Sequence, residues 1–252
     1  MFHAGGRNFN LMFSCRLQCI FPTMTTRGPS PIDQHNITVT RTARFAVIGS
    51  LDARADDVWF VCHGFGQLAV RFITRFSALA ADTRVIIAPE ALSRYYLTAP
   101  TSRQAPKSSV GASWMTTEDR EAEIDDYVAY LDKLYDQVFA AIPRRKAKLT
   151  VLGFSQGVAT ACRWLVAGRA EADRVILWAG MLPPELSAEG AAKLAKHEPL
   201  TMVVGRSDQF ATADVVAAEE ARLLGLGVPS RTLWFDGGHE VVPELLLDLA
   251  TR

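Results

Sequence analysis

The sequence lacks the features that mark nucleic-acid binders and membrane proteins. Basic and acidic residues are equal in number, 27 of each, so the formal net charge is zero. A nucleic-acid-binding domain usually carries a basic excess or a basic stripe, and the only basic run here is the short one at 144–146. No apolar run reaches the roughly 20 residues that a membrane span requires. We therefore expect no nucleic-acid partner and no integral membrane span.

Cysteine is also scarce. Of the four cysteines, Cys15 and Cys19 lie near the N-terminus, Cys62 falls in an apolar strand-like run and Cys162 in an apolar helical stretch. This spacing matches neither a disulfide framework nor a metal site. We interpret Cys62 and Cys162 as small buried hydrophobic residues. Such cysteine usage fits a reducing compartment, so we expect a cytoplasmic protein.

The first 31 residues differ from the rest. They contain arginines but no Asp or Glu, a composition typical of targeting peptides. However, Arg16 interrupts the apolar stretch 9–21, which argues against a secretory signal. We expect residues 1–31 to be an N-terminal extension that is disordered or reflects an overlong start, with translation beginning at Met24. Residues 32–252 are expected to form a single domain.

From residue 37 onward, short β-branched runs alternate with longer helical patterns. Strands are predicted at 37–48, 58–62, 84–88, 149–152, 174–178, 200–204 and 231–234. Helices are predicted at 69–81, 118–142, 156–168, 211–224 and 243–251. Strands that are apolar throughout belong to a sheet covered on both faces. The alternation therefore predicts an α/β fold, a three-layer α/β/α sandwich with a mostly parallel sheet, in which the alternating stretch 37–48 is an edge strand or hairpin.

One long segment, 91–117, breaks this rhythm. It runs through Tyr95 and Tyr96, a stretch rich in Pro and Ser, and then Trp114 and Met115. Loops of this length in compact domains are usually functional or disordered. It follows a predicted strand end, where ligands of open α/β sheets bind. These four aromatic and apolar side chains either line a substrate pocket or pack beneath the loop as core.

The strongest motif is Gly153-Phe154-Ser155-Gln156-Gly157, which matches G-x-S-x-G. A predicted strand precedes it and a predicted helix follows, as the nucleophile elbow of the α/β-hydrolase fold requires. The glycines are needed because side chains at their positions would collide with the neighbouring strand and helix. The tight turn lifts the serine hydroxyl clear of the sheet at a helix N-terminus, where negative charge is favoured. Ser155 is therefore the predicted nucleophile.

A serine hydroxyl needs a base to remove its proton, and in this fold the acid and the histidine follow the serine along the chain. His239 is the histidine that fits, because it follows a predicted strand and precedes the last helix. The other histidines fit less well: His3 and His35 are N-terminal, His63 precedes the serine, and His197 lies at a lysine-rich helix end. We predict His239 as the general base.

The acid is expected after the strand that precedes the histidine's strand. Asp208 is the first carboxylate there, and it would accept the Nδ1 proton of the histidine and fix its tautomer. Asp236 and Glu240 are rivals by proximity, but they lie too close along the chain to reach Nδ1 easily; Asp214 is a weaker rival. Asp208 is the predicted acid.

Two backbone amides are expected to bind the oxyanion. One is that of Gln156, the residue after the nucleophile, and the other comes from a loop after an early strand. The run His63-Gly64-Phe65-Gly66-Gln67 follows the strand 58–62, and its glycines let the chain fold back toward the serine. Phe65 is the predicted second donor. We expect His63 to hold this loop by a hydrogen bond rather than to act as a base.

In this order, the motifs HGFGQ, GFSQG, GRSDQF and GGHE resemble the phospholipase/carboxylesterase family, which includes acyl-protein thioesterases and small bacterial esterases. The resemblance covers residues 55–250. It implies a Ser–Asp–His triad, which maps onto Ser155, Asp208 and His239, and oxyanion amides, which map onto Phe65 and Gln156.

The chain departs from the family pattern at three places. Gln67 replaces the aspartate that usually follows the second glycine of the first motif. The usual proline pair before the mid-chain tryptophan is missing, and 111–115 reads GASWM instead. The segment 88–96 also differs from the usual form. The resemblance therefore implies the chemistry but not the acyl preference, and acyl-protein thioesterase activity does not follow from it.

The predicted function is that of a serine carboxylesterase that hydrolyses small carboxylic esters or thioesters through an acyl-enzyme on Ser155. This chemistry requires no metal and no organic cofactor. A peptidase or amidase on the same fold is one alternative, and it would act on aminoacyl amides. A catalytically silent binding module is the other, and it would not react with a fluorophosphonate probe. We expect a monomer or a homodimer.

Overall fold

A computed structural model describes residues 32–98, 109–196 and 198–251. The expectations for residues 1–31 and for His197 lie outside the described residues. The chain divides into two units, residues 1–40 and 41–252. In the first unit, residues 32–40 have neither helix nor strand and their side chains are exposed. The single domain over 32–252 stays a prediction, and the fold below is that of residues 41–252.

Seven strands form one sheet in the order β1-β3-β2-β6-β7-β8-β9. They are β1 (Phe45–Ile48), β2 (Asp57–Cys62), β3 (Arg84–Pro89), β6 (Lys148–Phe154), β7 (Arg174–Trp178), β8 (Leu200–Gly205) and β9 (Ser230–Phe235). Edge strand β1 runs antiparallel to β3, and all other neighbours are parallel. The mostly parallel sheet with an edge strand at its start is therefore confirmed.

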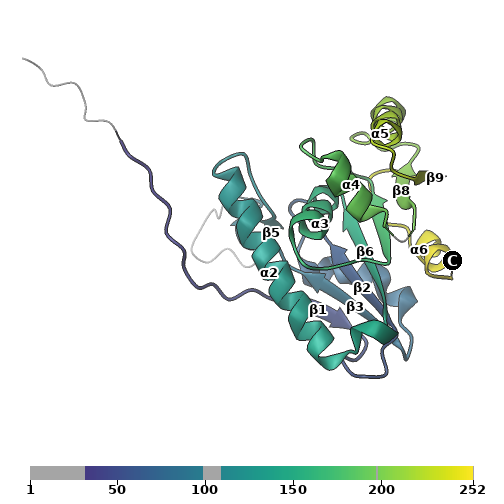
Figure 1. The fold of residues 1–252 in the computed structure, drawn as a ribbon, viewed down its shortest axis with the longest axis horizontal. Coiled ribbons are helices and arrows are strands. Elements are labelled where there is room, and N and C mark those ends of the chain that lie inside the picture. The colour runs from purple at the N-terminus through teal and green to yellow at the C-terminus, as the bar shows by residue number, and fades with distance from the viewer. Residues whose placement is uncertain (1–31, 99–108, 197, 252) are drawn as a thin grey trace, which may run out of the picture. The chain divides into compact units, whose positions relative to one another are not determined.

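Helices cover both faces of this sheet and make the three predicted layers (Figure 1). One apolar core lies under α2 (Arg120–Ala141), α3 (Gln156–Ala167), α4 (Ala188–Leu194) and α5 (Ala213–Gly225). The other lies under α1 (Ala69–Phe72), the 3-10 helix η1 (Ile73–Leu79) and α6 (Pro243–Thr251). Strand β7 is buried along its whole length because each face has its own helical cover.

Local sequence explains where the main helices begin and end. Helix α2 carries Glu121 and Glu123 in its first turn, where carboxylates favour the positive end of the helix dipole, and it ends just before Pro143. The side chain of Ser187 caps α4 by accepting a hydrogen bond from the N–H of Gly190 at 3.1 Å. Helix α3 starts directly after Ser155 and presents its first turn to the end of the sheet.

Some elements differ from their predictions. The strand expected at 37–48 is a strand only over Phe45–Ile48, where it pairs with β3 up to Pro89; one residue further, the carbonyl of Arg44 accepts the N–H of Glu90 at 3.1 Å. The helix expected at 69–81 is one α-helical turn followed by 3-10 helix. The basic run forms a short 3-10 turn, η2 (Arg144–Lys146), and neither this turn nor α4 was predicted.

The segment expected as a loop, 91–117, contains a hairpin. Strands β4 (Ser93–Tyr96) and β5 (Val110–Ser113) pair antiparallel, while residues 99–108 lie outside the described part. Gln67 adds a bridge to Ala112, so the loop after β2 runs alongside β5. The hairpin thus ties the predicted oxyanion loop to the segment that follows β3.

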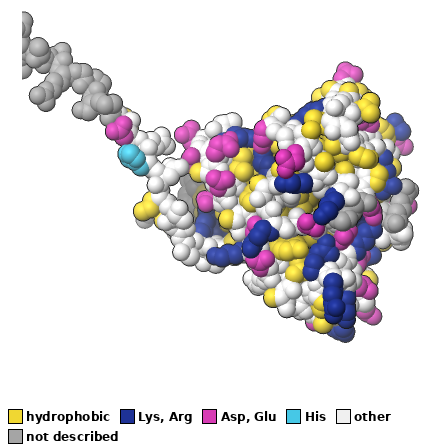
Figure 2. Space-filling view, in the orientation of Figure 1, with side chains coloured by type: hydrophobic (Ala, Val, Ile, Leu, Met, Phe, Trp, Pro, Cys, Tyr) yellow, Lys and Arg dark blue, Asp and Glu magenta, His cyan; other side chains and the backbone are white. Residues whose placement is uncertain are grey.

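Both signs of charge occur on the face drawn in Figure 2, with apolar side chains between them. Several of the exposed charges pair, as in Arg169 with Asp136 at 2.6 Å and Lys196 with Glu171 at 3.1 Å. Across the described ranges, no helix combines the length and the apolar character that crossing a membrane would need.

Candidate active site

Ser155 lies on a strained turn between β6 and α3. Its φ is 54° and its ψ is −119°, a backbone conformation that non-glycine residues rarely adopt. Such outliers persist only where the surroundings hold them, and they cluster at functional sites. Here the backbone N–H of Ser155 donates to the carbonyl of Trp178 at 2.9 Å, and the N–H of Val158 donates to the carbonyl of Ser155 at 2.9 Å.

Close backbone approach explains the glycines of the motif. A Cβ at Gly157 would lie 2.2 Å from the carbonyl oxygen of Cys62, so any side chain there would push the elbow away from β2. Gly64, in the loop after β2, lies against the serine itself, since a Cβ there would be 3.2 Å from the Cβ of Ser155. The loop predicted to supply an oxyanion donor therefore packs directly on the predicted nucleophile.

Asp208 and His239 meet at the ends of β8 and β9. Oδ2 of Asp208 lies 2.8 Å from Nδ1 of His239, and the carboxylate is fully buried while the imidazole is partly exposed. A carboxylate only accepts hydrogen bonds, so Nδ1 carries the proton and Nε2 of the neutral ring remains free to accept one. This is the tautomer that a general base requires.

The pKa of Asp208 is lowered. Burial raises it, but hydrogen bonds from the backbone N–H groups of Ala211 and Phe210 and the contact with His239 together outweigh the burial. Oδ1 accepts from Phe210 at 2.8 Å and from Ala211 at 3.0 Å, which leaves Oδ2 to the histidine. Asp208 is therefore ionised at neutral pH and fixed in orientation.

The rival carboxylates lie elsewhere. Asp236 is 97% exposed and pairs with Arg206 at 3.4 Å. Oε1 of Glu240 accepts from the N–H of Gly238 at 3.3 Å. Asp214 lies in the first turn of α5, and its side chain is exposed. Of the four acids considered, Asp208 is the one that contacts the imidazole.

The ring of His239 lies beside the elbow. Its centroid is 5.0 Å from that of Phe154, the residue before Ser155, and 4.9 Å from that of Phe210. No described residue forms a hydrogen bond with the Ser155 hydroxyl. The structure thus joins the predicted acid to the predicted base and packs the base against the neighbour of the predicted nucleophile. Apo hydrogen bonds to a nucleophile are often loose and tighten when substrate binds.

The two predicted oxyanion donors have free backbone N–H groups within the described ranges. The amides on either side of Phe65 are different: Gly66 donates to Ala112 at 2.9 Å, and Gly64 donates to Oε1 of Gln67 at 3.0 Å. No described acceptor takes the N–H of Phe65 or that of Gln156, the first residue of α3. Gln156 follows Ser155 in sequence, and Phe65 follows Gly64, which packs against Ser155. Both donors therefore lie next to the predicted nucleophile.

His63 holds the loop after β2. Its side chain is fully buried, and burial lowers its pKa despite the opposing effects of a backbone hydrogen bond and of Glu90. Nε2 accepts the N–H of Ala91 at 3.1 Å, so the proton of the neutral ring is on Nδ1, which donates to the carbonyl of Gly64 at 2.8 Å. The ring therefore links the end of β3 to the loop beside Ser155.

The side chain of Gln156 makes contacts that the sequence analysis missed. Oε1 accepts the N–H of Trp114 at 3.2 Å, while Nε2 donates to the carbonyl of Met115 at 2.9 Å and to Oγ of Ser113 at 3.2 Å. This amide thereby ties the first turn of α3 to the segment after β5. The G-x-S-x-G pattern leaves the residue after the serine open, so it gives no signal for this role.

The four predicted pocket residues divide into core and surface. Trp114 is 2% exposed, donates its indole N–H to the carbonyl of His63 at 2.8 Å and packs on Tyr127, so for Trp114 the core alternative holds. Met115 is half-buried and its sulfur lies 3.4 Å from Arg163. Tyr95 is half-buried against Phe65, with ring centroids 5.5 Å apart, and Tyr96 is 60% exposed.

Two exposed aromatic side chains lie beside the site. Phe65 is 59% exposed and Phe210 is 65% exposed, and these residues belong to the predicted oxyanion loop and to the loop of Asp208. Water-exposed phenylalanines at a candidate site are informative because they offer apolar surface to a ligand. Phe210 was not among the predicted site residues, although its place two positions after Asp208 was a usable signal.

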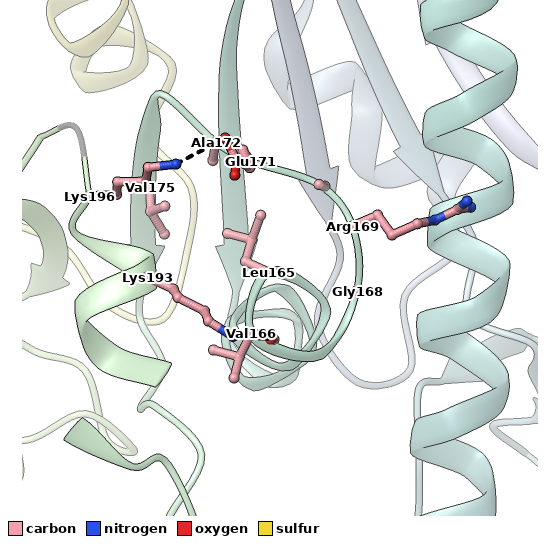
Figure 3. A pocket seen from close by; sticks show the side chains of 10 residues that line it. Leu165, Val166, Gly168, Arg169, Glu171, Ala172, Val175, Lys193 and Lys196 are labelled. Atoms are coloured by element: carbon pink, nitrogen blue, oxygen red, sulfur yellow. Dashed lines mark hydrogen bonds and ion pairs between the residues drawn. The ribbon is translucent and has the colours of Figure 1, made fainter. Parts of the chain in front are cut away.

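A cavity of about 360 Å³ lies away from these residues (Figure 3). It is formed by the last turn of α3, the segment that leads into β7, and α4, and its lining includes Leu165, Val175, Lys193 and Lys196. Ser155 precedes the opposite end of α3, and a helix rises about 1.5 Å per residue. None of the predicted site residues lines the cavity, so the candidate active site is assigned from the arrangement of Ser155, Asp208 and His239 and not from this cavity.

Within the part of the chain that the structure covers, no three His, Cys, Asp or Glu side chains lie close enough together to bind a metal ion.

The sequence matches the Phospholipase/Carboxylesterase family over residues 43–249. No curated protein matches it. Among solved structures, acyl-protein thioesterase 2 of Zea mays is 20% identical with a TM-score of 0.58, and the match covers 83% of this chain and 97% of that one. Esterase PE8 is 19% identical with a TM-score of 0.56, covering 84% and 97%.

The carboxylesterase of Bacillus cereus is similar at 11% identity with a TM-score of 0.56, and the match covers 83% of this chain and 92% of that one. At such identities these likenesses show a shared fold. The family match extends over most of the chain and confirms the resemblance carried by the four motifs. The chain therefore belongs to the phospholipase/carboxylesterase family of α/β-hydrolases.

Proposed function

We propose that this chain is a serine carboxylesterase that hydrolyses small carboxylic esters or thioesters through an acyl-enzyme on Ser155. The observation that carries the proposal is the hydrogen bond between buried Asp208 and His239, at 2.8 Å, with the imidazole packed beside the strained elbow of Ser155. A structural role alone would not require a serine at a positive φ next to an oriented imidazole.

The proposed reaction has two steps. The Ser155 oxygen attacks the carbonyl carbon, His239 takes the hydroxyl proton on Nε2, and the amides of Phe65 and Gln156 donate to the oxyanion. The tetrahedral intermediate then expels the alcohol or thiol, which receives that proton from His239. In the second step a water gives its proton to His239, attacks the acyl carbon and releases the acid, and His239 returns the proton to Ser155.

Exposed apolar surface supports an apolar acyl or alcohol group in the substrate. The exposed ring of Phe210 packs on the imidazole of His239, and the exposed ring of Phe65, in the predicted oxyanion loop, packs against Tyr95. The alternatives predict different reactivity: an amidase would cleave aminoacyl amides faster than esters, and a binding module would cleave neither.

The test is labelling with a fluorophosphonate probe followed by a panel of esters and thioesters of increasing acyl length. Wild type should be labelled and should hydrolyse the panel, whereas Ser155→Ala should do neither. Ser207→Ala is the matched control, because Ser207 is exposed next to Asp208 and its one hydrogen bond among the described residues runs from its backbone N–H to the carbonyl of Gly237, at 2.9 Å. Folded wild-type protein that resists the probe would refute the proposal.

We also propose that the enzyme is cytoplasmic and is a monomer or a homodimer. In support of the compartment, both cysteines in the described ranges, Cys62 and Cys162, are free and fully buried. Light scattering on the purified chain tests the oligomeric state, and cell fractionation tests the compartment.

A further inference from the structure

Two strands separate the predicted nucleophile from the predicted base. Ser155 follows β6 and His239 follows β9, with β7 and β8 between them in the sheet. The imidazole nevertheless lies beside Phe154, so the loop after β9 must be held back across β8 and β7. The bond to Asp208, at the end of β8, fixes the ring from one side only.

Trp178, the last residue of β7, contacts both partners. Its backbone carbonyl accepts the N–H of Ser155 at 2.9 Å. Its indole Nε1 donates to the carbonyl of Glu240, the residue after His239, at 2.7 Å. One residue on β7, the intervening strand next to β6, therefore binds the backbone of the nucleophile and the backbone next to the base.

The indole has little freedom to move. Trp178 is fully buried and its ring packs on Phe235, with centroids 5.9 Å apart. The backbone behind it is also fixed, because the N–H of Ala179 donates to the carbonyl of Val203 at 2.8 Å and Gly180 lies against the carbonyl of Ser155. A hydrogen bond from so rigid a donor sets the position of its acceptor.

We propose that Trp178 is a positioning residue that sets the placement of His239 relative to Ser155 through its indole hydrogen bond to Glu240. This inference rests on the proposed serine hydrolase function. Trp178 is buried away from solvent, so it acts through the loop and not on the substrate. Loss of the indole donor should slow acylation and leave substrate binding unchanged, because a small misplacement of a base lowers the rate steeply.

The test compares Trp178→Phe with Trp59→Phe. The first keeps an aromatic ring and removes the donor to Glu240. The control removes an equally buried indole of the same core, whose donor bond goes to Oδ1 of Asp57 at 2.9 Å, at the start of β2. Fluorophosphonate labelling and kcat should fall at least about tenfold in Trp178→Phe, with KM within about twofold, and both should stay within about twofold of wild type in Trp59→Phe.

A second readout requires no activity. The Nδ1 proton of His239 should give an NMR signal, assigned by its loss in His239→Asn, and this proton should exchange faster with water in Trp178→Phe but not in Trp59→Phe. Equal slowing of labelling in both variants, or wild-type labelling with an unchanged His239 signal in Trp178→Phe, overturns the proposal.

The two readouts separate this inference from the proposed function. If wild type resists the probe, the hydrolase proposal fails, and the His239 signal alone decides whether Trp178 holds the loop. If Trp178→Phe does not fold, 3-benzothienylalanine at position 178 replaces the indole N–H by sulfur at nearly constant shape. The same two outcomes then apply to that variant.

Discussion

Nδ1 of His239 lies 2.8 Å from Oδ2 of Asp208, although 31 positions of sequence separate the two residues. The bond forms because β8 and β9 are parallel neighbours, with Gly205 paired to Phe235, so that the loops after both strands leave the same edge of the sheet. The remaining carboxylate oxygen is held by two backbone N–H groups. The histidine therefore meets an acceptor that is already fixed.

Asp208→Asn is expected to lower kcat by up to about 10⁴-fold, because an amide no longer stabilises the imidazolium or fixes its tautomer. The change is nearly isosteric, so KM should change little. Steady-state kinetics on an ester from the panel measures both. Asp236→Asn is the matched control, since that carboxylate lies closer to His239 in sequence but is 97% exposed and pairs with Arg206. Equal loss in both variants would show that Asp208 has no special role.

Gln156→Leu is expected to destabilise the fold by about 1–3 kcal/mol, because the N–H of Trp114 loses its acceptor and the carbonyl of Met115 keeps only the bond from Oγ of Ser113. Urea unfolding measures the change. Ser113→Ala removes the bonds of Oγ to Nε2 of Gln156 and to the carbonyl of Met115, but it keeps the bond between Gln156 and the N–H of Trp114, so it should cost less. If Gln156→Leu loses no more stability than Ser113→Ala, the bond between Gln156 and the N–H of Trp114 does not stabilise the fold as described.

Gly157→Ala is expected to prevent folding or to cost at least about 3 kcal/mol, because its Cβ would lie 2.2 Å from the carbonyl oxygen of Cys62. Gly225→Ala makes the same substitution at the end of α5, where nothing lies within 4 Å of the added Cβ. That variant should gain about 0.4–1 kcal/mol, since alanine restricts the unfolded chain. Thermal unfolding distinguishes the two, and a stable Gly157→Ala would contradict the packing described for the elbow.

Glu185→Gln is expected to lower stability at neutral pH by less than about 1 kcal/mol, since the carboxylate is half exposed and solvent screens its ion pairs. Burial raises the pKa of Glu185, but hydrogen bonds and charge, chiefly from Arg163 at 2.6 Å, lower it overall to about 2.

The sign of the pH effect follows from that shift. The unfolded chain takes up the Glu185 proton first as the pH falls, so the stabilisation is complete above about 4.5, the ordinary pKa, and is lost toward about 2. The unfolding free energies of wild type and Glu185→Gln should therefore converge over this window. Curves that stay parallel down to pH 2 would contradict the assignment.

Local sequence was sufficient for most elements. The predicted bounds of β6, α3 and β7 differ from the observed ones by at most a few residues. The reason is that a strand buried on both faces and an amphipathic helix can each be recognised from the pattern of apolar residues within the segment itself. The helix at 69–81 was less well predicted. Its apolar spacing fits α-helix, but most of it is 3-10 helix packed against α6.

Contacts between distant segments were not predictable in the same way. In the sequence, Trp178 is one more apolar residue of a predicted strand. Nothing in the sequence shows that its indole N–H donates to the carbonyl of Glu240, 62 positions later. Gln156 was expected to act only through its backbone, yet its side chain binds residues 113–115. Both contacts depend on which strands are neighbours and on how the loops cross the sheet edge.

The sequence by itself determined the α/β alternation, the strand–turn–helix around Ser155 and the chain order in which Asp208 and His239 follow it. These features depend on residues within a few positions of one another, where periodicity, glycine and proline act directly on the backbone. Only the tertiary structure decided that Asp208 binds His239, that Trp114 lies in the core and that Trp178 joins two loops. Such contacts arise from the packing of strands in register, which no local pattern specifies.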